Sequence, residues 1–207
     1  MLPGTQCEGP SLAVTETACA PHSYPCNLRL ADLEVGLRLM TADDEEKLLA
    51  FARRLPEHDL LFLPVDITRR ETVRAWIANV EADRTSTVLA EVDGELAGYG
   101  SLHRSELLWI RHLGEIRILV SSRYRGQGVG GELARQVVEL ARATDLHKLM
   151  VNMMSTQRDA QALFHRLGFI PEALLNDWVI DRAGRMHDLI VMSREVADVE
   201  LDDEPEG

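Results

Sequence analysis

The segment EIRILVSSRYRGQGVGG, residues 115–131, decides the expected architecture of this chain. An apolar run from Ile116 to Val120 stands shortly before four glycines in six residues, from Gly126 to Gly131. Glycine adopts the positive φ angles of tight turns and lets a backbone approach a ligand closely. The segment therefore predicts a buried strand, a tight glycine loop and the start of a helix.

The residues after the loop predict an amphipathic helix, because apolar side chains recur on one helical face, at Val129, Leu133, Val137 and Leu140. The free N–H groups and the dipole at the start of such a helix favour a pyrophosphate. Arg123 and Arg125 add positive charge beside it. A turn without a ligand is the plainer alternative, but four glycines cost conformational entropy that a plain turn does not need.

A dinucleotide site is a second alternative for the loop, because Gly126, Gly128 and Gly131 also fit the spacing G-x-G-x-x-G. That fingerprint expects an acid about 20 residues further on, at the end of the next strand. The expected strand from Lys148 to Met154 contains no acid, and Asn152 is its nearest polar residue. The loop also follows an antiparallel hairpin, past the middle of the chain. The sequence therefore disfavours a dinucleotide, and it lacks the Gly-Lys-Ser/Thr of a phosphate-binding loop of the Walker type.

Hydrophobic periodicity predicts alternating strands and helices on both sides of the loop. Expected strands cover residues 35–40, 87–92, 96–102, 115–120, 148–154, 174–180 and 186–192, with hairpin turns at Asp93-Gly94 and 181–184. Four helices are expected. The first lies between Thr41 and Pro56, and the second starts at Thr68, where Glu71 completes a capping box. The third follows the glycine loop, and the fourth runs from Ala160 to Leu167 and ends before Gly168. This order predicts an α/β fold with a mixed, mostly antiparallel sheet of about seven strands and about four helices.

Composition limits the class of protein further. The chain has 207 residues, 45% of them hydrophobic, and a formal net charge of −12. This charge disfavours binding to nucleic acid or to an anionic membrane, and the sequence shows neither a long apolar span nor a secretory signal. We therefore expect a cytoplasmic protein without nucleic-acid or membrane partners.

The two ends of the chain differ from its centre. Residues 1–27 hold four prolines and all three cysteines (Cys7, Cys19 and Cys26), and we interpret them as a disordered tail. Their spacing around His22 lacks a Cys-x-x-Cys pair, so no metal site is expected. Residues 195–207 are strongly acidic and are expected to form a solvated tail. The domain is thus predicted to cover residues 28–194.

Two motifs together resemble the GNAT superfamily of acyl-CoA-dependent N-acetyltransferases. The pattern Arg/Gln-x-x-Gly-x-Gly/Ala is met by Arg125, Gly128 and Gly130 after the strand 115–120. Downstream, Gln157-x-x-Ala-x-x-x-Phe164-x-x-x-Gly-Phe is similar to the helix after the family's fifth strand. The resemblance covers residues 35–193, with its strongest part at 113–169, and it implies acetyl-CoA as co-substrate.

The resemblance also implies site residues. The family binds the pyrophosphate on the loop amides, pairs the pantetheine arm with the strand that precedes the loop, and points the thioester into a gap between the fourth and fifth strands. In this chain the implied coenzyme-binding residues are Ile118, Leu119, Val120, Arg125, Gly126, Gln127, Gly128, Val129, Gly130, Gly131, Asn152, Gln157 and Phe164.

For the chemistry, the resemblance implies direct attack of a neutral amine on the thioester, with a backbone amide near Val120 stabilising the oxyanion. Glu115 is the predicted general base. A structural ion pair with Arg117, or binding of a cationic substrate, stays open as an alternative role for Glu115. Phe164 stands where the family often has a tyrosine that donates a proton, and Tyr124, His165 or solvent are the remaining donors.

The acceptor is a primary amine, in a small molecule or on a protein lysine or N-terminus. A non-catalytic acyl-CoA sensor is the alternative function, and a homodimer stays open. The sequence fixes neither the acceptor nor the preferred acyl chain.

Overall fold

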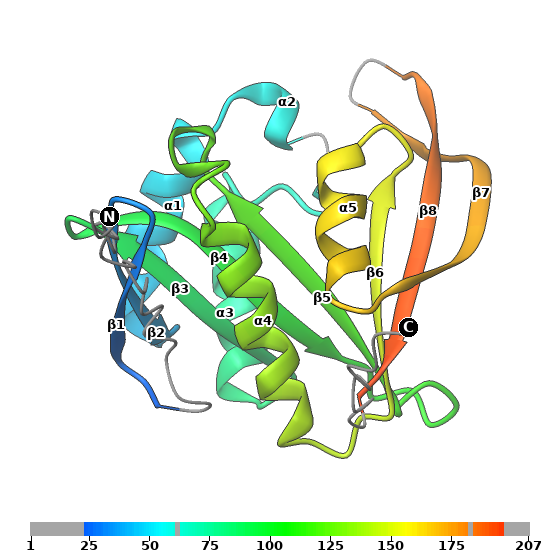
Figure 1. The fold of residues 1–207 in the computed structure, drawn as a ribbon, viewed down its shortest axis with the longest axis horizontal. Coiled ribbons are helices and arrows are strands. Elements are labelled where there is room, and N and C mark those ends of the chain that lie inside the picture. Colours follow the sequence, from blue (N-terminus) through cyan, green and yellow to red (C-terminus); the bar gives the residue numbers. More distant parts are fainter. Residues whose placement is uncertain (1–22, 61–62, 182–183, 197–207) are drawn as a thin grey trace, which may run out of the picture.

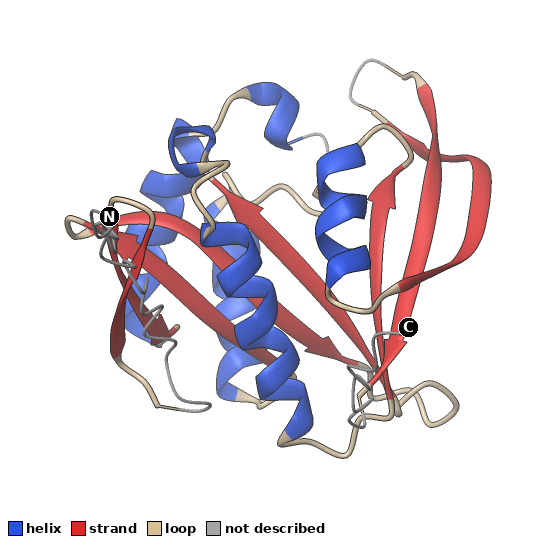
Figure 2. Cartoon of the chain, in the orientation of Figure 1, coloured by secondary structure: helices blue, strands red, loops and turns tan. Residues whose placement is uncertain are grey.

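The computed structural model describes residues 23–60, 63–181 and 184–196. One sheet of eight strands runs through this part of the chain, in the order β1-β2-β3-β4-β5-β6-β8-β7 (Figures 1 and 2). Neighbouring strands are antiparallel except β5 and β6, which are parallel. The predicted mixed, mostly antiparallel α/β fold is therefore confirmed.

The strands lie close to the predicted positions, with one addition. Their bounds are β1 Cys26–Leu30, β2 Leu33–Leu39, β3 Thr85–Val92, β4 Glu95–Arg104, β5 Leu113–Val120, β6 Lys148–Met154, β7 Ile170–Ile180 and β8 Met186–Glu195. The addition is β1, which pairs with β2 through a turn at Ala31, where φ is +49°. The domain thus begins before the predicted start at Leu28: Tyr24 donates a hydrogen bond to Gln136 Oε1 at 2.5 Å.

Helices cover both faces of the sheet. They are α1 Glu45–Arg54, α2 Glu57–Leu60, α3 Arg70–Glu81, α4 Val129–Arg142 and α5 Arg158–Arg166, with short 3-10 turns at Ala42–Asp44 and Ser122–Tyr124. Figure 1 shows α4 and α5 in front of the sheet and α1 and α3 behind it. Because side chains alternate along a strand, Val88 and Ala90 pack in a core with α4, whereas Leu89 packs in a core with α1 and α3.

Two local predictions were wrong. Thr68 does not cap the second long helix: α3 begins at Arg70 after the N-cap Arg69, and the Thr68 hydroxyl donates to Asp66 Oδ1 at 2.6 Å. The short helix α2 was not predicted, since four residues are too few for a periodic signal.

Cys26 is disulfide-bonded, which the sequence reading did not expect. Cys7, Cys19 and the rest of residues 1–22 lie outside the described residues, as does most of the acidic C-terminal segment. Within the described ranges no helix is long and apolar enough to cross a membrane.

The sheet opens between β5 and β6, the only parallel pair among the described strands. Pairing between β5 and β6 is limited to the register Leu113–Lys148, Gly114–Leu149 and Glu115–Met150, although both strands continue. Figure 1 shows the two strands meeting at one end and separating toward the other, where α4 and α5 begin. The edge of β5 from Ile116 onward therefore faces a gap in the sheet.

Candidate active site

The glycine loop lies at the open end of this gap. Gly126 and Gly128 have φ angles of +74° and +89°, and Gly128 is the left-handed N-cap of α4. These angles favour glycine because a side chain would strain the backbone. The first amides of α4, from Val129 onward, have no acceptor within the helix and point out of its positive end. The geometry fits the anionic group that the sequence predicted.

Gly130 and Gly131 leave two positions in the first turn of α4 without side chains. A Cβ atom on Gly130 would lie 3.5 Å from Val120 Cγ2 and 4.0 Å from Leu163 Cδ2, which are ordinary contact distances. A Cβ on Gly131 would lie 3.6 Å from Leu163 Cδ1. The folded chain therefore has room for a small side chain at both positions. With glycine at both positions, the space between β5 and α5 that such side chains would fill stays available to a ligand.

Arg125 holds the loop in place. Its Nε donates to the Val120 carbonyl at 3.0 Å, and its Nη2 lies 2.6 Å from the Asp59 carboxylate of α2. The Asp59 side chain is only 3% exposed. Arg125 therefore joins the end of β5, the loop and α2, and its guanidinium is committed to these contacts. Gln127 is similarly tied back, since its Nε2 donates to the Arg123 carbonyl at 3.0 Å.

Two of the three predicted residues beyond the gap have structural partners. Gln157 Oε1 accepts the Met154 N–H at 2.9 Å, which leaves its Nε2 as the group able to donate to a ligand. Phe164 is buried against Phe169, with ring centroids 5.1 Å apart. Asn152 is exposed, and strand alternation places it opposite Val151 and Met153, which pack with α4 and α5. Packing alone accounts for Phe164, and the coenzyme contacts of all three residues stay predictions.

Glu115 and Arg117 form an ion pair on the sheet face that carries α1 and α3. Arg117 Nε and Nη2 donate to the two carboxylate oxygens of Glu115 at 2.9 and 3.0 Å. The structural alternative for Glu115 is therefore present, and it does not remove the catalytic one. An amine that approaches from this face meets a carboxylate whose two oxygens are already bound by a guanidinium.

His103 stands beside this pair and was missed in the sequence. It is the β4 residue opposite Glu115 in the antiparallel register. Its ring nitrogens lie 2.8 Å from Ser101 Oγ and 3.2 Å from Thr85 Oγ1. Burial, together with the positive charge of Arg117, lowers the pKa of His103 to about 4. The imidazole is therefore neutral at pH 7 and adds no charge to the pair.

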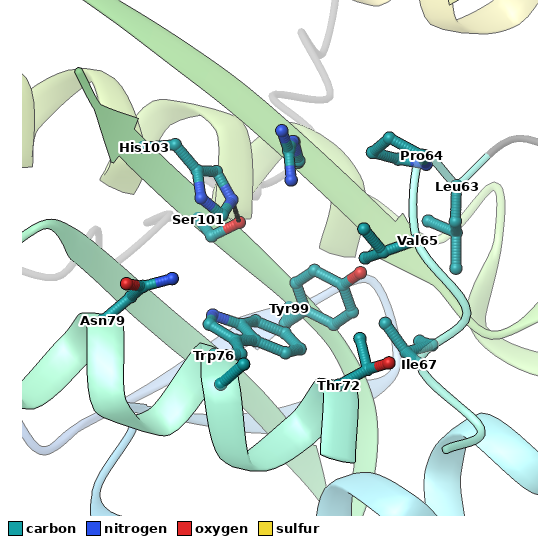
Figure 3. A pocket seen from close by; sticks show the side chains of 12 residues that line it. Leu63, Pro64, Val65, Ile67, Thr72, Trp76, Asn79, Tyr99, Ser101 and His103 are labelled. Carbon is teal, nitrogen blue, oxygen red and sulfur yellow. Dashed lines mark hydrogen bonds between the residues drawn. The ribbon is translucent and has the colours of Figure 1, made fainter. Parts of the chain in front are cut away.

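A cavity of about 160 Å³ borders these groups. Figure 3 shows Asn79, Ser101 and His103 at one end of the cavity and Pro64, Val65 and Ile67 at the other, where Thr72 also lies. The full lining is Leu63, Pro64, Val65, Ile67, Thr72, Ala75, Trp76, Asn79, Tyr99, Ser101, His103 and Arg117. A single sequence could not reveal this set, because it joins the 63–67 segment, α3, β4 and β5 through contacts distant along the chain.

A second cavity, of about 140 Å³, is adjacent to the first. The two share Leu63, Pro64 and Val65 as lining residues, and the second is completed by Leu60, Asp66, Ile180 and Asp181. It therefore lies beside the first cavity, toward the end of β7.

The remaining proton donors proposed from the sequence differ in access. Tyr124 is buried, with the Arg123 guanidinium 5.2 Å from its ring centroid, and His165 is exposed on α5. Tyr99 is a further hydroxyl that the sequence reading missed. Burial raises the pKa of Tyr99, so its hydroxyl keeps its proton beside the cavity.

A parallel pair that opens toward a glycine loop and a helix start defines the acyl-CoA-binding class of N-acyltransferases. The chain belongs to the acetyltransferase (GNAT) family, whose model matches residues 52–169. The predicted family, with acetyl-CoA as its co-substrate, is thereby confirmed.

The relatives give this family assignment its detail. The chain is 29% identical over 96 residues to a Bacillus subtilis protein with the provisional name ribosomal protein bS18-alanine N-acetyltransferase, a match that covers 45% of this chain. The chain spans 60% of the length of that relative. A ribosomal-protein-alanine N-acetyltransferase structure from Brucella melitensis is 26% identical, covers 77% of this chain and 98% of its own, and has a TM-score of 0.68.

A third structure, yncA from Salmonella typhimurium with its cofactor acetyl-CoA, is 19% identical. It covers 82% of this chain and 98% of its own, with a TM-score of 0.67. This likeness supports the same fold.

Proposed function

We propose that this chain transfers the acetyl group of acetyl-CoA to the α-amine at the N-terminus of a protein. The observation that carries the proposal is the gap between β5 and β6. The anion-binding end of α4 lies at its mouth, and the Glu115–Arg117 pair and a preformed cavity lie on the other face of β5. The two substrates can thus approach one point of β5 from opposite faces of the sheet.

On the coenzyme side, the residues of the chain bind and orient. The amides at the start of α4 take the pyrophosphate, and the exposed Arg123 adds a positive charge nearby. The unpaired edge of β5 from Ile118 to Val120 takes the amides of the pantetheine arm as an added strand would. The coenzyme supplies an activated thioester.

On the acceptor side, Glu115 accepts the proton of the incoming ammonium and Arg117 restricts where that carboxylate points. Attack by the neutral amine on the thioester carbon forms the C–N bond, and collapse of the tetrahedral intermediate breaks the C–S bond. Nitrogen loses a second proton as the amide forms, and the coenzyme leaves as a thiolate that takes up a proton. A backbone amide near Val120 stabilises the oxyanion of the tetrahedral intermediate. The thiolate takes up its proton from solvent or from the Tyr99 hydroxyl, which lines the cavity on this face.

The acceptor class comes from the relatives. The Bacillus and Brucella proteins are both named for the alanine of a ribosomal protein. Two adjoining cavities on the acceptor face support a peptide chain as acceptor.

The test is a thiol-release assay with acetyl-CoA and a panel of peptides, free amino acids and small amines. We expect release with peptides that have a free α-amine and none with the same peptides blocked at that amine. Acetylation of lysine side chains alone would contradict the α-amine proposal.

A non-catalytic acyl-CoA sensor is the second candidate. It is favoured by Phe164, which offers no proton, and by the closed Glu115–Arg117 pair. Tight coenzyme A binding without turnover of any acceptor would support the sensor.

A further inference from the structure

The cavity beside Glu115 and Arg117 is large enough for a bulky side chain. At about 160 Å³ it matches the size of an apolar cavity of roughly 150 Å³ that admits benzene. A leucine, methionine or phenylalanine side chain would occupy most of such a space. The methyl group of alanine would leave most of it unfilled.

The cavity lining combines polar and apolar side chains, which suits an amphipathic ligand. Figure 3 shows Trp76 and Tyr99 in the middle of the cavity, with His103 and Ser101 on one side and Pro64, Val65 and Ile67 on the other. Arg117 lines the cavity and binds Glu115 directly. An α-amine held at Glu115 would therefore place its own side chain among apolar groups.

The cavity is preformed, because its central rings are fixed. Trp76 Nε1 donates to Thr87 Oγ1 at 3.1 Å, and the Trp76 and Tyr99 rings meet edge to face with centroids 4.7 Å apart. Both side chains are at least nine-tenths buried. A pocket with rigid walls discriminates by size, since it cannot collapse around a smaller guest.

The second cavity distinguishes a peptide from a free amino acid. It shares Leu63, Pro64 and Val65 with the first and extends to Ile180 and Asp181 at the end of β7. An acceptor with a chain beyond its first residue can occupy this extension, and a free amino acid cannot.

We propose that the cavity selects the first residue of the acceptor, and that this residue has a bulky apolar side chain such as leucine, methionine or phenylalanine rather than alanine. The inference rests on the proposed function and names its acceptor. It sets this chain apart from the relatives named for alanine.

Peptide binding provides a test that does not require turnover. Peptides of one sequence that begin with alanine, leucine, methionine or phenylalanine are titrated into the full chain saturated with coenzyme A, and heat is measured. At about 0.8 kcal/mol per buried methylene, we expect the leucine peptide to bind roughly 10- to 50-fold more tightly than the alanine peptide. Equal affinities, or tighter binding of the alanine peptide, would overturn the inference.

A variant that fills the cavity tests whether the preference for a leucine peptide arises there. Ala75 lines the cavity from an exposed position on α3, and Ala78 is exposed on the same helix without lining it. Ala75→Leu should remove the leucine preference, with at least about a tenfold loss of affinity for the leucine peptide and little change for the alanine peptide. Ala78→Leu is the matched control and should keep the preference. Equal losses of affinity for the leucine peptide in both variants would show that the first residue of the peptide does not bind in this cavity.

Thiol release with the same panel separates the two proposals. Binding with the expected order but no release would leave the pocket intact and contradict the acetyltransferase proposal. Release at equal rates from the leucine and alanine peptides would contradict the pocket alone. Tighter binding of free leucine than of the leucine peptide would overturn the peptide assignment.

Discussion

At the scale of single residues, the candidate site depends on how Glu115 and Arg117 share their charges. The guanidinium donates one hydrogen bond to each carboxylate oxygen, so an incoming ammonium competes with it for the carboxylate through the second lone pair of each oxygen. The neutral His103 next to them does not contribute to this competition at pH 7. Proton transfer to Glu115 therefore takes place beside the fixed positive charge of Arg117.

Replacing Glu115 tests this role. Glu115→Gln keeps the shape of the side chain and removes its charge, so kcat/KM should fall at least about 100-fold, as is typical of a lost general base. The loss should be greatest below the pKa of the amine, where the acceptor must be deprotonated, and should shrink above it. A pH–rate profile of both proteins measures this. Glu172→Gln, which breaks an ion pair with Lys148 at the edge of the sheet, is the control. A profile of unchanged shape in Glu115→Gln would remove Glu115 as the base.

His103 makes a separate prediction about stability. Burial and Arg117 lower its pKa from 6.5 to about 4 in the folded state, so between these values the unfolded chain binds the extra proton. The stability that depends on neutral His103 is therefore present above pH 6.5 and is lost as the pH falls toward 4. We expect a loss of about 2 to 3 kcal/mol across this window. Urea unfolding from pH 7 to pH 4.5 should show a shallower decline in His103→Gln than in the parent. Parallel declines would contradict the prediction.

The residue-level site was only partly predictable. The loop glycines, Arg125 and Glu115 lie in one continuous segment, so local pattern sufficed to find them. Trp76, Tyr99, Ser101 and His103 carry no local signal, because their meeting depends on how α3 packs on β4. Arg125 was found in the sequence, but its contact with Asp59 requires the position of α2, a helix that was not expected.

At the scale of elements, the first turn of α4 is the point where chain and coenzyme compete for space. The folded chain tolerates a Cβ at Gly130, since its nearest neighbours would lie at 3.5 and 4.0 Å. The same Cβ would enter the gap between β5 and α5. The fold alone does not require glycine here, so a ligand is the better reason for it.

Gly130→Ala separates these two requirements. Alanine is favoured over glycine inside a helix, so stability should stay the same or rise by up to about 1 kcal/mol. Affinity for coenzyme A should nevertheless fall, by at least about tenfold, and calorimetry measures both effects. Gly184→Ala, with φ of +79° and open space around it, should instead lower stability slightly and leave coenzyme affinity unchanged. Full affinity in Gly130→Ala would contradict the proposed path of the coenzyme.

The contact between α2 and the glycine loop supplies another prediction. Asp59→Asn keeps the volume of a 3% exposed side chain but removes its charge from Arg125. Breaking a buried pair costs up to 3–5 kcal/mol, and the half-exposed Arg125 reduces this to about 1 to 3 kcal/mol. The loop should loosen, so coenzyme A affinity should fall along with the melting temperature. Unchanged affinity in a destabilised variant would show that the pair supports the fold alone.

The elements themselves were largely predictable because each long one carries its own period. The α4 stripe from Val129 to Leu140 and the apolar run of β5 needed no tertiary information. The strand β1 was missed because its residues were grouped with a proline-rich tail, and what stabilises it is distant in the sequence: pairing with β2 and burial of Leu28 in the core with α4. Thr68 was predicted to cap α3 because Glu71 follows it at capping-box spacing. In the structure its hydroxyl instead donates to the neighbouring Asp66.

At the scale of the whole molecule, the sheet consists of two parts joined by little pairing. The strands β1 to β5 form one part and β6 to β8 the other, and only three residue pairs connect them. Further links are the backbone hydrogen bonds of His147 and Lys148 to the His112 carbonyl, and the core in which Leu102 and Ile116 of the first part pack with Val151 and Met192 of the second. A ligand in the gap would contact α4 and β5 of one part and α5 of the other. Coenzyme binding should therefore stabilise the molecule as a unit.

A thermal shift measures this coupling. A ligand that binds only the folded chain stabilises it by about 2.7 kcal/mol at a concentration 100 times its Kd. For a chain of 207 residues, roughly 2 to 4 °C per kcal/mol gives a rise in Tm of about 5 to 11 °C. With its affinity lowered at least about tenfold, Gly130→Ala should lose about half of this rise or more at the same concentration, although its Tm without ligand should equal or exceed that of the parent. Because the ligand bridges both parts, amide hydrogen exchange should slow in β6 and α5 as well as in α4. Protection confined to α4 would mean that the coenzyme binds the loop without entering the gap, which would contradict the proposed path of the thioester.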